Sequence, residues 1–402
     1  MKQHSLMVAR PVLTLLFACS VLACSKPAEK PKYDPGVTDT EIKIGQTMPY
    51  SGPASAYGTI GRAEAAYFKK INEAGGINGR KINFISVDDS YSPPKAVEQV
   101  RKLVEEDQVL AIFQPLGTPS NTAIQKYLNT KKVPQLFVST GATKWGDPKQ
   151  FPWTIGFNPS YQLEAKTYAE HLLKTNPNAK AAVLYQNDDF GKDYLTGLKE
   201  KLGAKASMIV KEVSYEVTDA TIDSQMATLQ ASGATVFFNI ATPKFAAQAI
   251  RKAFDSGWKP VQYLSNVSAS VGSVLTPAGL DKSAGVITTA YLKDPTDKRW
   301  DNDPAMKEYL AFLAKYYPEA KPIDGSNLYG MVAAQTLEQV LKQCGSDLTR
   351  ENVMKQAASL KDFAPNLLQP GVKMNTGPDD FFVFDSLTLA KFSGTTWEPL
   401  TN

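Results

Sequence analysis

Apolar and polar residues recur with two different periods along most of the chain, and the two periods alternate. Residues 95–106 show the helical period, because Ala96, Val100 and Leu103 return at the spacing of one helix face. Short apolar runs between such segments are typical of buried strands. Strands are predicted over residues 41–45, 82–87, 109–113, 135–138, 180–185, 207–213, 235–240 and 261–264. Helices are predicted over residues 61–74, 95–106, 121–130, 161–174, 191–202, 221–231 and 246–255.

This alternation of strand and helix predicts the class of fold. Parallel neighbouring strands need crossover connections, which are right-handed and place helices on both faces of the sheet. The series is broken at residues 147–152, where Pro148 and Pro152 preclude a regular element. We therefore predict an α/β protein with two doubly wound parallel-sheet lobes. Ligands of such sheets bind beyond the carboxyl ends of the strands, so a cleft shared by the lobes is expected.

The first 38 residues depart from the pattern. After a short basic start, residues 11–23 are apolar and uncharged, which is too short to cross a bilayer but typical of a secretory signal. The stretch ends in Val-Leu-Ala before Cys24, which resembles a bacterial lipobox. We predict a lipoprotein signal peptide over residues 1–23, lipidation of Cys24, and a solvated tether over residues 24–38. An ordinary cleavage site followed by a chance cysteine is the alternative.

Charge and cysteine content narrow the possible functions. The chain has 44 Lys and Arg against 40 Asp and Glu and contains no basic block, so nucleic-acid binding is not expected. Cys344 is the only cysteine beyond the predicted signal and lipobox, which excludes a disulfide framework. It follows a helical pattern over residues 333–342, and we interpret it as a buried structural thiol. After the signal, no segment is apolar and long enough to span a membrane.

The side chains that enzymes use are scarce. His171 is the only histidine after the signal and lies in a predicted helix, which favours a surface or packing role. No His and Cys cluster has metal-ligand spacing, and neither a phosphate loop nor a nucleophile elbow is present. The pairs Asp88, Asp89 and Asp188, Asp189 follow predicted strands, where they suit turns and helix N-termini better than acid–base catalysis. We expect no catalysis, no metal and no cofactor.

Four motifs follow one another along the chain. They are PYSGPA from Pro49, INEAGGINGR from Ile71, the Asp88 pair before a proline-led helix, and NDDFG from Asn187. Together they resemble the leucine/isoleucine/valine-binding proteins over nearly the whole body of the chain. The resemblance implies a type I periplasmic binding fold whose lobes are joined by three hinge crossovers. It also implies a monomer in the periplasm that delivers its ligand to an ABC permease with its ATPase, and that touches the membrane only through the lipid anchor.

The resemblance also gives the expected boundaries of the lobes. Hinge strands are placed near residues 154–158, 288–291 and 369–374. The first lobe would comprise residues 39–156 plus 289–370. The second lobe would comprise residues 157–288 plus 371–402. Closure of the two lobes about the hinges, favoured by the bound ligand, is the implied mechanism.

First-lobe loops carry the positions at which the family grips an amino acid's carboxylate. The matching residues here are Thr118, Gly141, Ala142 and Thr143. Hydroxyls and backbone N–H groups at a helix N-terminus suit this role, although the two threonines could serve only as helix caps. Phe190 occupies the position of an aromatic residue that closes over the ligand. A packing role is the alternative for Phe190.

Two positions depart from the family pattern. Val267 stands where the family has an acidic residue against the ligand's ammonium, and Ala241 lies where a tyrosine helps to hold the amine. An ammonium buried without a carboxylate partner is costly. We therefore expect a small carboxylate without an α-amine, with an aromatic or hydrophobic body for which Tyr57 and Tyr329 could supply stacking surfaces. A branched-chain or other amino acid is the alternative ligand, and a ligand-sensing module on the same fold is the further alternative.

Overall fold

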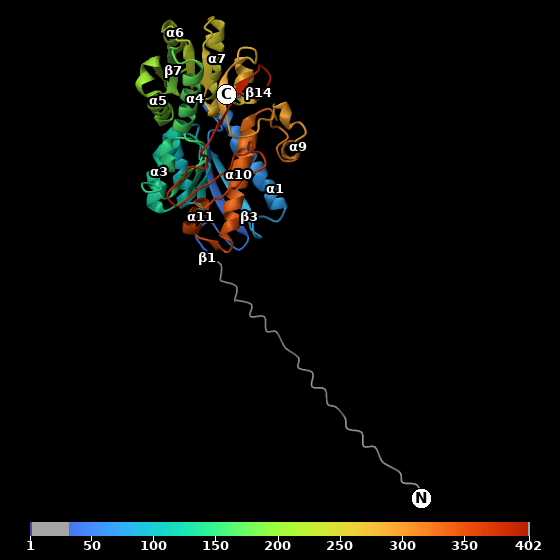
Figure 1. The fold of residues 1–402 in the computed structure, drawn as a ribbon. Helices are drawn as coiled ribbons and strands as arrows, with labels where there is room; N and C mark the ends of the chain where they lie inside the picture. Colours follow the sequence, from blue (N-terminus) through green and yellow to red (C-terminus); the bar gives the residue numbers. More distant parts are fainter. Residues whose placement is uncertain (2–31, 401–402) are drawn as a thin grey trace.

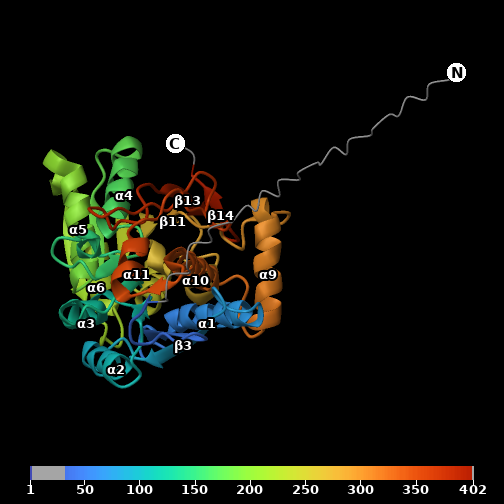
Figure 2. The ribbon, with the colours of Figure 1, turned by 90° about the horizontal axis from the view of Figure 1, so that it is seen from below.

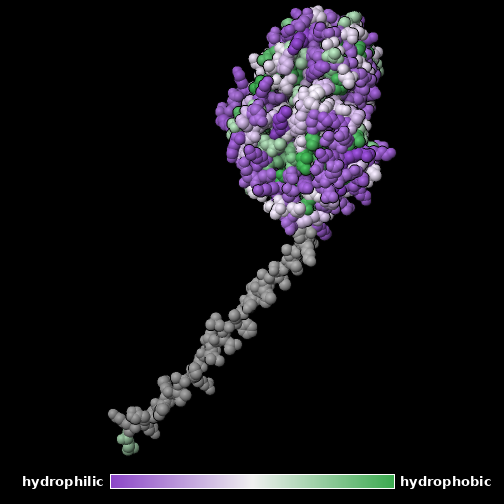
Figure 3. Space-filling model, turned by 180° about the vertical axis from the view of Figure 1, so that it is seen from behind, coloured by the Kyte–Doolittle hydropathy of each residue, from purple (hydrophilic) through white to green (hydrophobic). Residues whose placement is uncertain are grey.

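The computed structural model of the chain describes Met1 and residues 32–400, which form two α/β lobes stacked one on the other (Figure 1). Apart from Met1, the predicted signal peptide lies outside the described residues, and so does the lipidation site Cys24. In the view of Figure 3 the surface is largely hydrophilic, with small apolar areas. Within the described part of the chain, no helix combines the length and the apolar character that a membrane span requires.

The first lobe is built on a five-stranded parallel sheet with the order β3-β2-β4-β5-β6. Its strands are β2 (Glu41–Met48), β3 (Lys81–Asp88), β4 (Ala111–Phe113), β5 (Gln135–Val138) and β6 (Thr154–Gly156). Its helices are α1 (Gly58–Glu73), α2 (Pro93–Glu105), α3 (Thr118–Lys131), α9 (Pro304–Tyr316), α10 (Gly325–Cys344) and α11 (Arg350–Ala357). Helices α1 and α10 pack together on one face of the sheet, and α2 and α3 cover the other (Figure 2). The sheet is therefore buried on both faces, as the alternation predicted.

The second lobe contains a seven-stranded sheet with the order β14-β13-β11-β10-β9-β7-β8. Its strands are β7 (Ala181–Gln186), β8 (Ile209–Tyr215), β9 (Val236–Ile240), β10 (Val261–Leu264), β11 (Ile287–Ala290), β13 (Thr388–Phe392) and β14 (Trp397–Pro399). Its longer helices are α4 (Tyr161–Thr175), α5 (Asp189–Leu202), α6 (Asp223–Ala231) and α7 (Pro243–Asp255). Helices α4 and α5 pack on one face and α6 and α7 on the other. Because β13 and β14 run antiparallel at one edge, this sheet is mixed and not wholly parallel as predicted.

Side-chain caps set where several helices begin. The Asp188 carboxylate accepts hydrogen bonds from the backbone N–H groups of Phe190 and Gly191 at the start of α5, at 2.9 and 3.4 Å. Asp303 and Asp324 cap α9 and α10 in the same way. Carboxylates are favourable at helix N-termini, where N–H groups lack intrahelical partners. The prediction that Asp188 serves a helix N-terminus is therefore confirmed.

Two residues that could have carried chemistry have packing roles. Cys344 ends α10 and is buried, and burial raises the pKa of its thiol to about 12. His171 on α4 is buried too, with its Nδ1 2.6 Å from the Tyr263 hydroxyl oxygen. Burial lowers the pKa of His171. Both residues therefore serve the core, as the sequence predicted.

Three segments of the chain cross between the lobes. The first runs from β6 to α4, and the second leaves β11 and brings Leu292 into a bridge with Leu368. The third crosses only between Phe384 and β13, because Met374 and Phe384 are buried in the first-lobe core. The second-lobe tail therefore does not begin at residue 371, where the sequence placed it. The irregular segment after residue 371 has no period from which its burial could have been predicted.

The folded body also begins earlier than predicted. Strand β1 (Lys32–Tyr33) pairs in parallel with β12 (Asp347–Leu348) at the end of the first lobe that lies away from the second lobe (Figure 1). The backbone N–H of Arg350 donates to the Asp34 carboxylate at 2.7 Å. Residues 32–38 are therefore part of the first lobe and not of the predicted tether over residues 24–38.

Candidate ligand-binding site

A cavity of about 390 Å³ lies between the two lobes. Its volume falls within the range of small-molecule sites, about 300–1,000 Å³. Leu116 and Ser139 reach it just after β4 and β5 of the first lobe, and Thr242 and Asn266 just after β9 and β10 of the second. The cavity therefore occupies the carboxyl edge of both sheets, where doubly wound folds bind their ligands.

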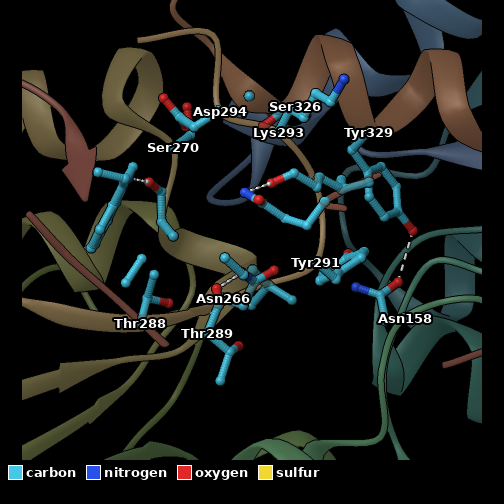
Figure 4. Close-up of a pocket in the computed structure, with 18 of the residues that line it drawn as sticks. Asn158, Asn266, Ser270, Thr288, Thr289, Tyr291, Lys293, Asp294, Ser326 and Tyr329 are labelled. Atoms are coloured by element: carbon cyan, nitrogen blue, oxygen red, sulfur yellow. Dashed lines mark hydrogen bonds between the residues drawn. The ribbon is translucent and has the colours of Figure 1, made fainter. Parts of the chain in front are cut away.

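Aromatic side chains form much of the cavity wall. They are Tyr57, Tyr91, Tyr161, Phe190, Tyr291, Tyr329 and Trp397. The rings of Tyr161 and Phe190 lie 4.9 Å apart between centroids. The Tyr329 hydroxyl donates to the Asn158 amide oxygen at 2.7 Å, a bond visible in Figure 4. Such walls suit a ligand with a planar or apolar body, since aromatic faces pack well against both.

The first-lobe end of the cavity carries uncharged hydrogen-bonding groups. Gly117 precedes α3 with a φ of 100°, a conformation that favours glycine, and the helix then begins at Thr118 beside the cavity. The first N–H groups of a helix have no partner within the helix, and they attract negative charge. The Thr118 hydroxyl contacts that of Thr140, which also hydrogen-bonds the Tyr161 hydroxyl at 3.2 Å. This end can therefore hold a carboxylate without a cationic side chain.

The structure brings together about half of the residues that the sequence singled out for binding. Those that line the cavity are Tyr57, Thr118, Phe190, Val267 and Tyr329. Those that do not line it are Gly141, Ala142, Thr143 and Ala241. Thr242, the neighbour of Ala241, takes part in the wall instead.

The segment that contains Gly141, Ala142 and Thr143 packs against the second lobe. The backbone N–H of Thr143 donates to the Asp193 carboxylate on α5 at 2.5 Å, and its hydroxyl oxygen lies 3.0 Å from that of Ser160. Gly141 and Ala142 are buried. The carboxylate expected from a ligand at Thr143 is thus supplied by the protein itself. Sequence spacing could not reveal this contact, because Asp193 lies far along the chain.

On the second-lobe side, a buried carboxylate supports the cavity wall. Glu164 on α4 accepts hydrogen bonds from the Asn266 backbone N–H at 2.8 Å and from the Tyr168 hydroxyl at 2.6 Å. The Asn266 side chain donates to the Thr289 carbonyl at 2.5 Å (Figure 4). Burial raises the pKa of Glu164 from its ordinary value of 4.5 to about 7. The loop that carries Asn266 and Val267 therefore rests on a group that titrates near neutrality.

This titration predicts a measurable dependence of stability on pH. Between pH 4.5 and 7 the unfolded Glu164 is ionised while the folded one keeps its proton, so stability falls as pH rises. Replacing Glu164 with Gln should reduce that fall by up to about 2–3 kcal/mol, measured as the free energy of unfolding in urea at several pH values. Glu170→Gln on the same helix is the control, because Glu170 is exposed, and it should leave the fall in place. An unchanged fall in Glu164→Gln would contradict the assignment.

The cavity also reaches charged residues that sequence reasoning missed. Lys293, Asp294, Asp297 and Arg299 line its hinge end, just after the second crossover. Lys293 pairs with Asp303 at 2.7 Å, and Arg299 pairs with Asp297 at 2.5 Å. No motif marks these residues. The available signal was the density of charge directly after a predicted hinge strand.

The fold and the cavity define a class of protein. Two doubly wound lobes, three crossovers and a cavity lined by both lobes are the architecture of a two-lobed α/β binding protein. The sequence profile of the periplasmic binding protein family matches residues 41–391, and the chain belongs to that family. The predicted type I periplasmic binding fold is therefore confirmed. The family binds solutes outside the cytoplasm for ABC transporters, which agrees with the transport role expected from the sequence.

Individual relatives agree with this assignment. The Leu/Ile/Val-binding protein homolog 1 of Brucella abortus (strain 2308) is 28% identical over 330 residues, which cover 80% of this chain and 84% of the relative. A branched-chain amino acid ABC transporter protein from Thermus thermophilus with bound valine matches with a TM-score of 0.81 at 15% identity, covering 91% of this chain and 96% of that one. A fatty acid ABC transporter substrate-binding protein from Thermomonospora curvata matches with a TM-score of 0.76 at 23% identity, covering 92% and 94%. The two structural matches establish the fold alone.

Proposed function

We propose that the protein captures a small carboxylate that lacks an α-amine and has an aromatic or hydrophobic body. Closure of the two lobes about the hinge retains the ligand until a permease of the ABC type receives it. We further propose that the chain is a monomer held to the membrane by a lipid on Cys24, which mass spectrometry of the membrane-extracted protein tests. Catalysis has no part in this role.

One observation carries the proposal for the ligand. An α-amine is attached to the carbon next to the carboxylate, so its partner must lie close to the groups that hold the carboxylate. Among the described residues, the acidic side chains that line the cavity are Asp294 and Asp297, and both lie at the hinge end. The loop after β10 offers Asn266 and Val267 in place of an acid. A ligand held by the start of α3 would thus bury its ammonium without a counter-ion, at a cost that disfavours amino acids.

A branched-chain amino acid remains the second candidate, because the relatives with printed ligands include one with bound valine. The ligand-sensing role is the third. The described residues include no helix that could span a membrane, and a sensing role needs such a segment from elsewhere.

A ligand panel tests the proposal. We expect benzoate or cinnamate to raise the melting temperature of the purified mature protein, because a ligand at 100 times its Kd stabilises the folded state by about 2.7 kcal/mol. Leucine and valine at the same concentrations should leave the melting temperature unchanged. Stabilisation by leucine or valine, with none by the aromatic acids, would overturn the proposal and favour the amino-acid alternative.

A further inference from the structure

At the hinge end of the cavity, one carboxylate has no cationic partner among the residues that the structure describes. Lys293 and Arg299, the two cations that line this end, are paired one to one with Asp303 and Asp297. Asp294 is left over. Its Oδ1 accepts hydrogen bonds from the Thr296 backbone N–H at 2.8 Å and from the Thr296 hydroxyl at 2.5 Å. Its Oδ2 has no hydrogen-bond partner among the described residues, although Asp294 lines the cavity.

The neighbouring hydroxyl and N–H groups are already bound elsewhere. Ser270 donates its hydroxyl to the Asp324 carboxylate at 2.7 Å, and the backbone N–H of Ser326 donates to the same oxygen at 3.1 Å. Burial raises the pKa of Asp294 to about 6, and the nearby carboxylates of Asp297 and Asp324 add to the effect. Asp294 and Asp324 thus give this end an excess of negative charge over the paired cations. A ligand carboxylate is repelled from it.

The carboxylate-binding end lies on the opposite side of the cavity. Ser139 contacts the Tyr329 hydroxyl at 3.0 Å, and its carbonyl accepts the N–H of Gly117 directly before α3. Tyr329 and Asn158 therefore mark the side on which α3 begins. Figure 4 shows these two residues on one side of the cavity, and Asp294 beside Ser270 on the other. The cavity thus has a pole that favours an anion and a pole that accepts hydrogen bonds, with aromatic side chains in its wall.

We propose that Asp294 determines specificity by accepting a hydrogen bond from a donor group that the ligand carries opposite its carboxylate. The inference deepens the proposed function and rests on it. The ligand class is then a carboxylate with an apolar or aromatic body and a hydroxyl or amino group at its far end. Hydrogen bonds to a charged acceptor contribute about 1.5–3 kcal/mol, and a buried acceptor left without a donor is costly, so the preference for such ligands is strong.

Paired acids of two lengths test the proposal on the purified mature protein. The probes are 4-hydroxybenzoate against 4-methoxybenzoate, and 4-hydroxycinnamate against 4-methoxycinnamate, because the methoxy group fills similar space without donating. Calorimetric titration should show the hydroxylated acid binding at least about tenfold more tightly in one of the two pairs. Asp294→Asn should reduce that ratio to about twofold or less. Its amide oxygen can still accept from Thr296, while its NH₂ group replaces the accepting Oδ2.

Controls separate this inference from the proposed function. Asp301→Asn changes an exposed aspartate outside the cavity and should keep the wild-type ratio. Equal affinity for the members of both pairs in the wild type would overturn the inference and leave the proposed function standing. An unchanged ratio in Asp294→Asn would do the same, and would show that Asp294 serves only the turn at Thr296. Binding of none of the four acids would overturn the inference, and the panel of benzoate, cinnamate, leucine and valine would then decide the proposed function separately.

Discussion

Replacing Val267 with Asp is expected to exchange the ligand preference of the protein. Val267 lines the second-lobe side of the cavity, where the family resemblance places an acidic residue. A carboxylate introduced there is partly desolvated and repels a bound benzoate or cinnamate. We expect the affinity for such acids to fall roughly a hundredfold, or about 3 kcal/mol. Leucine, whose ammonium meets the new carboxylate, should become a ligand, and titration calorimetry with cinnamate and leucine measures both changes.

The matched control for this exchange is Val267→Asn, because asparagine has nearly the shape of aspartate but carries no charge. It should lose much less affinity for cinnamate and gain none for leucine. If Asn and Asp have equal effects, the loss reflects altered packing of the loop after β10 and not charge. Tight binding of leucine by the unmodified protein would contradict the premise of the experiment.

The second large effect is expected at Gly141. A Cβ added to this residue would lie 2.3 Å from the Pro159 carbonyl oxygen and 2.7 Å from the Tyr161 ring. Moving either neighbour costs free energy, because one is a backbone carbonyl and the other is the buried ring of Tyr161 in the cavity wall. We expect Gly141→Ala to lower the free energy of unfolding by about 3 kcal/mol, measured in urea, since overpacking a buried site costs roughly 1–3 kcal/mol and occasionally more. Ligand affinity should fall as well, because Tyr161 must move.

Gly377→Ala provides the comparison for Gly141. No heavy atom lies within 4 Å of a Cβ at Gly377, and its backbone is not in the left-handed region. That substitution should change the free energy of unfolding by less than about 0.5 kcal/mol. Similar losses at the two positions would mean that the close packing of Gly141 against Tyr161 carries little energy.

The sequence predicted the regular part of the fold because helix and strand periods are local properties. The strand predicted over residues 135–138 has the same bounds as β5, and the helix predicted over residues 61–74 corresponds to α1, Gly58–Glu73. Two errors arose where burial depends on distant partners. Tyr33 is ordered by pairing with Leu348, and Met374 by the first-lobe core. Neither partner is visible in the surrounding sequence.

The candidate site was predictable only where it follows strand ends. Thr118, at the start of the helix after β4, lines the cavity as expected. Thr143 has an equally suitable sequence context, but its backbone N–H donates to the Asp193 carboxylate of the second lobe. Asp294 lies in a Lys-Asp-Pro-Thr segment that resembles an ordinary turn. Only the three-dimensional structure shows that it lines the cavity, with one carboxylate oxygen that has no hydrogen-bond partner among the described residues. A sequence thus predicts which groups can bind a ligand, but it does not show whether another residue of the protein already binds those groups.

The pairing of β1 with β12 determines which lobe receives a force that is applied at the N-terminus. Any load transmitted through Lys32 enters the first lobe. A chain held at its N-terminus would therefore keep that lobe in place while the second lobe moves about the hinge. With the proposed lipid on Cys24, the eight residue steps from Cys24 to Lys32 would span at most about 28 Å. A binding protein held so close to the membrane would reach its permease by diffusion along the membrane surface and not through the bulk solvent. The frequency of these encounters would then depend on the surface density of the binding protein and the permease in the membrane.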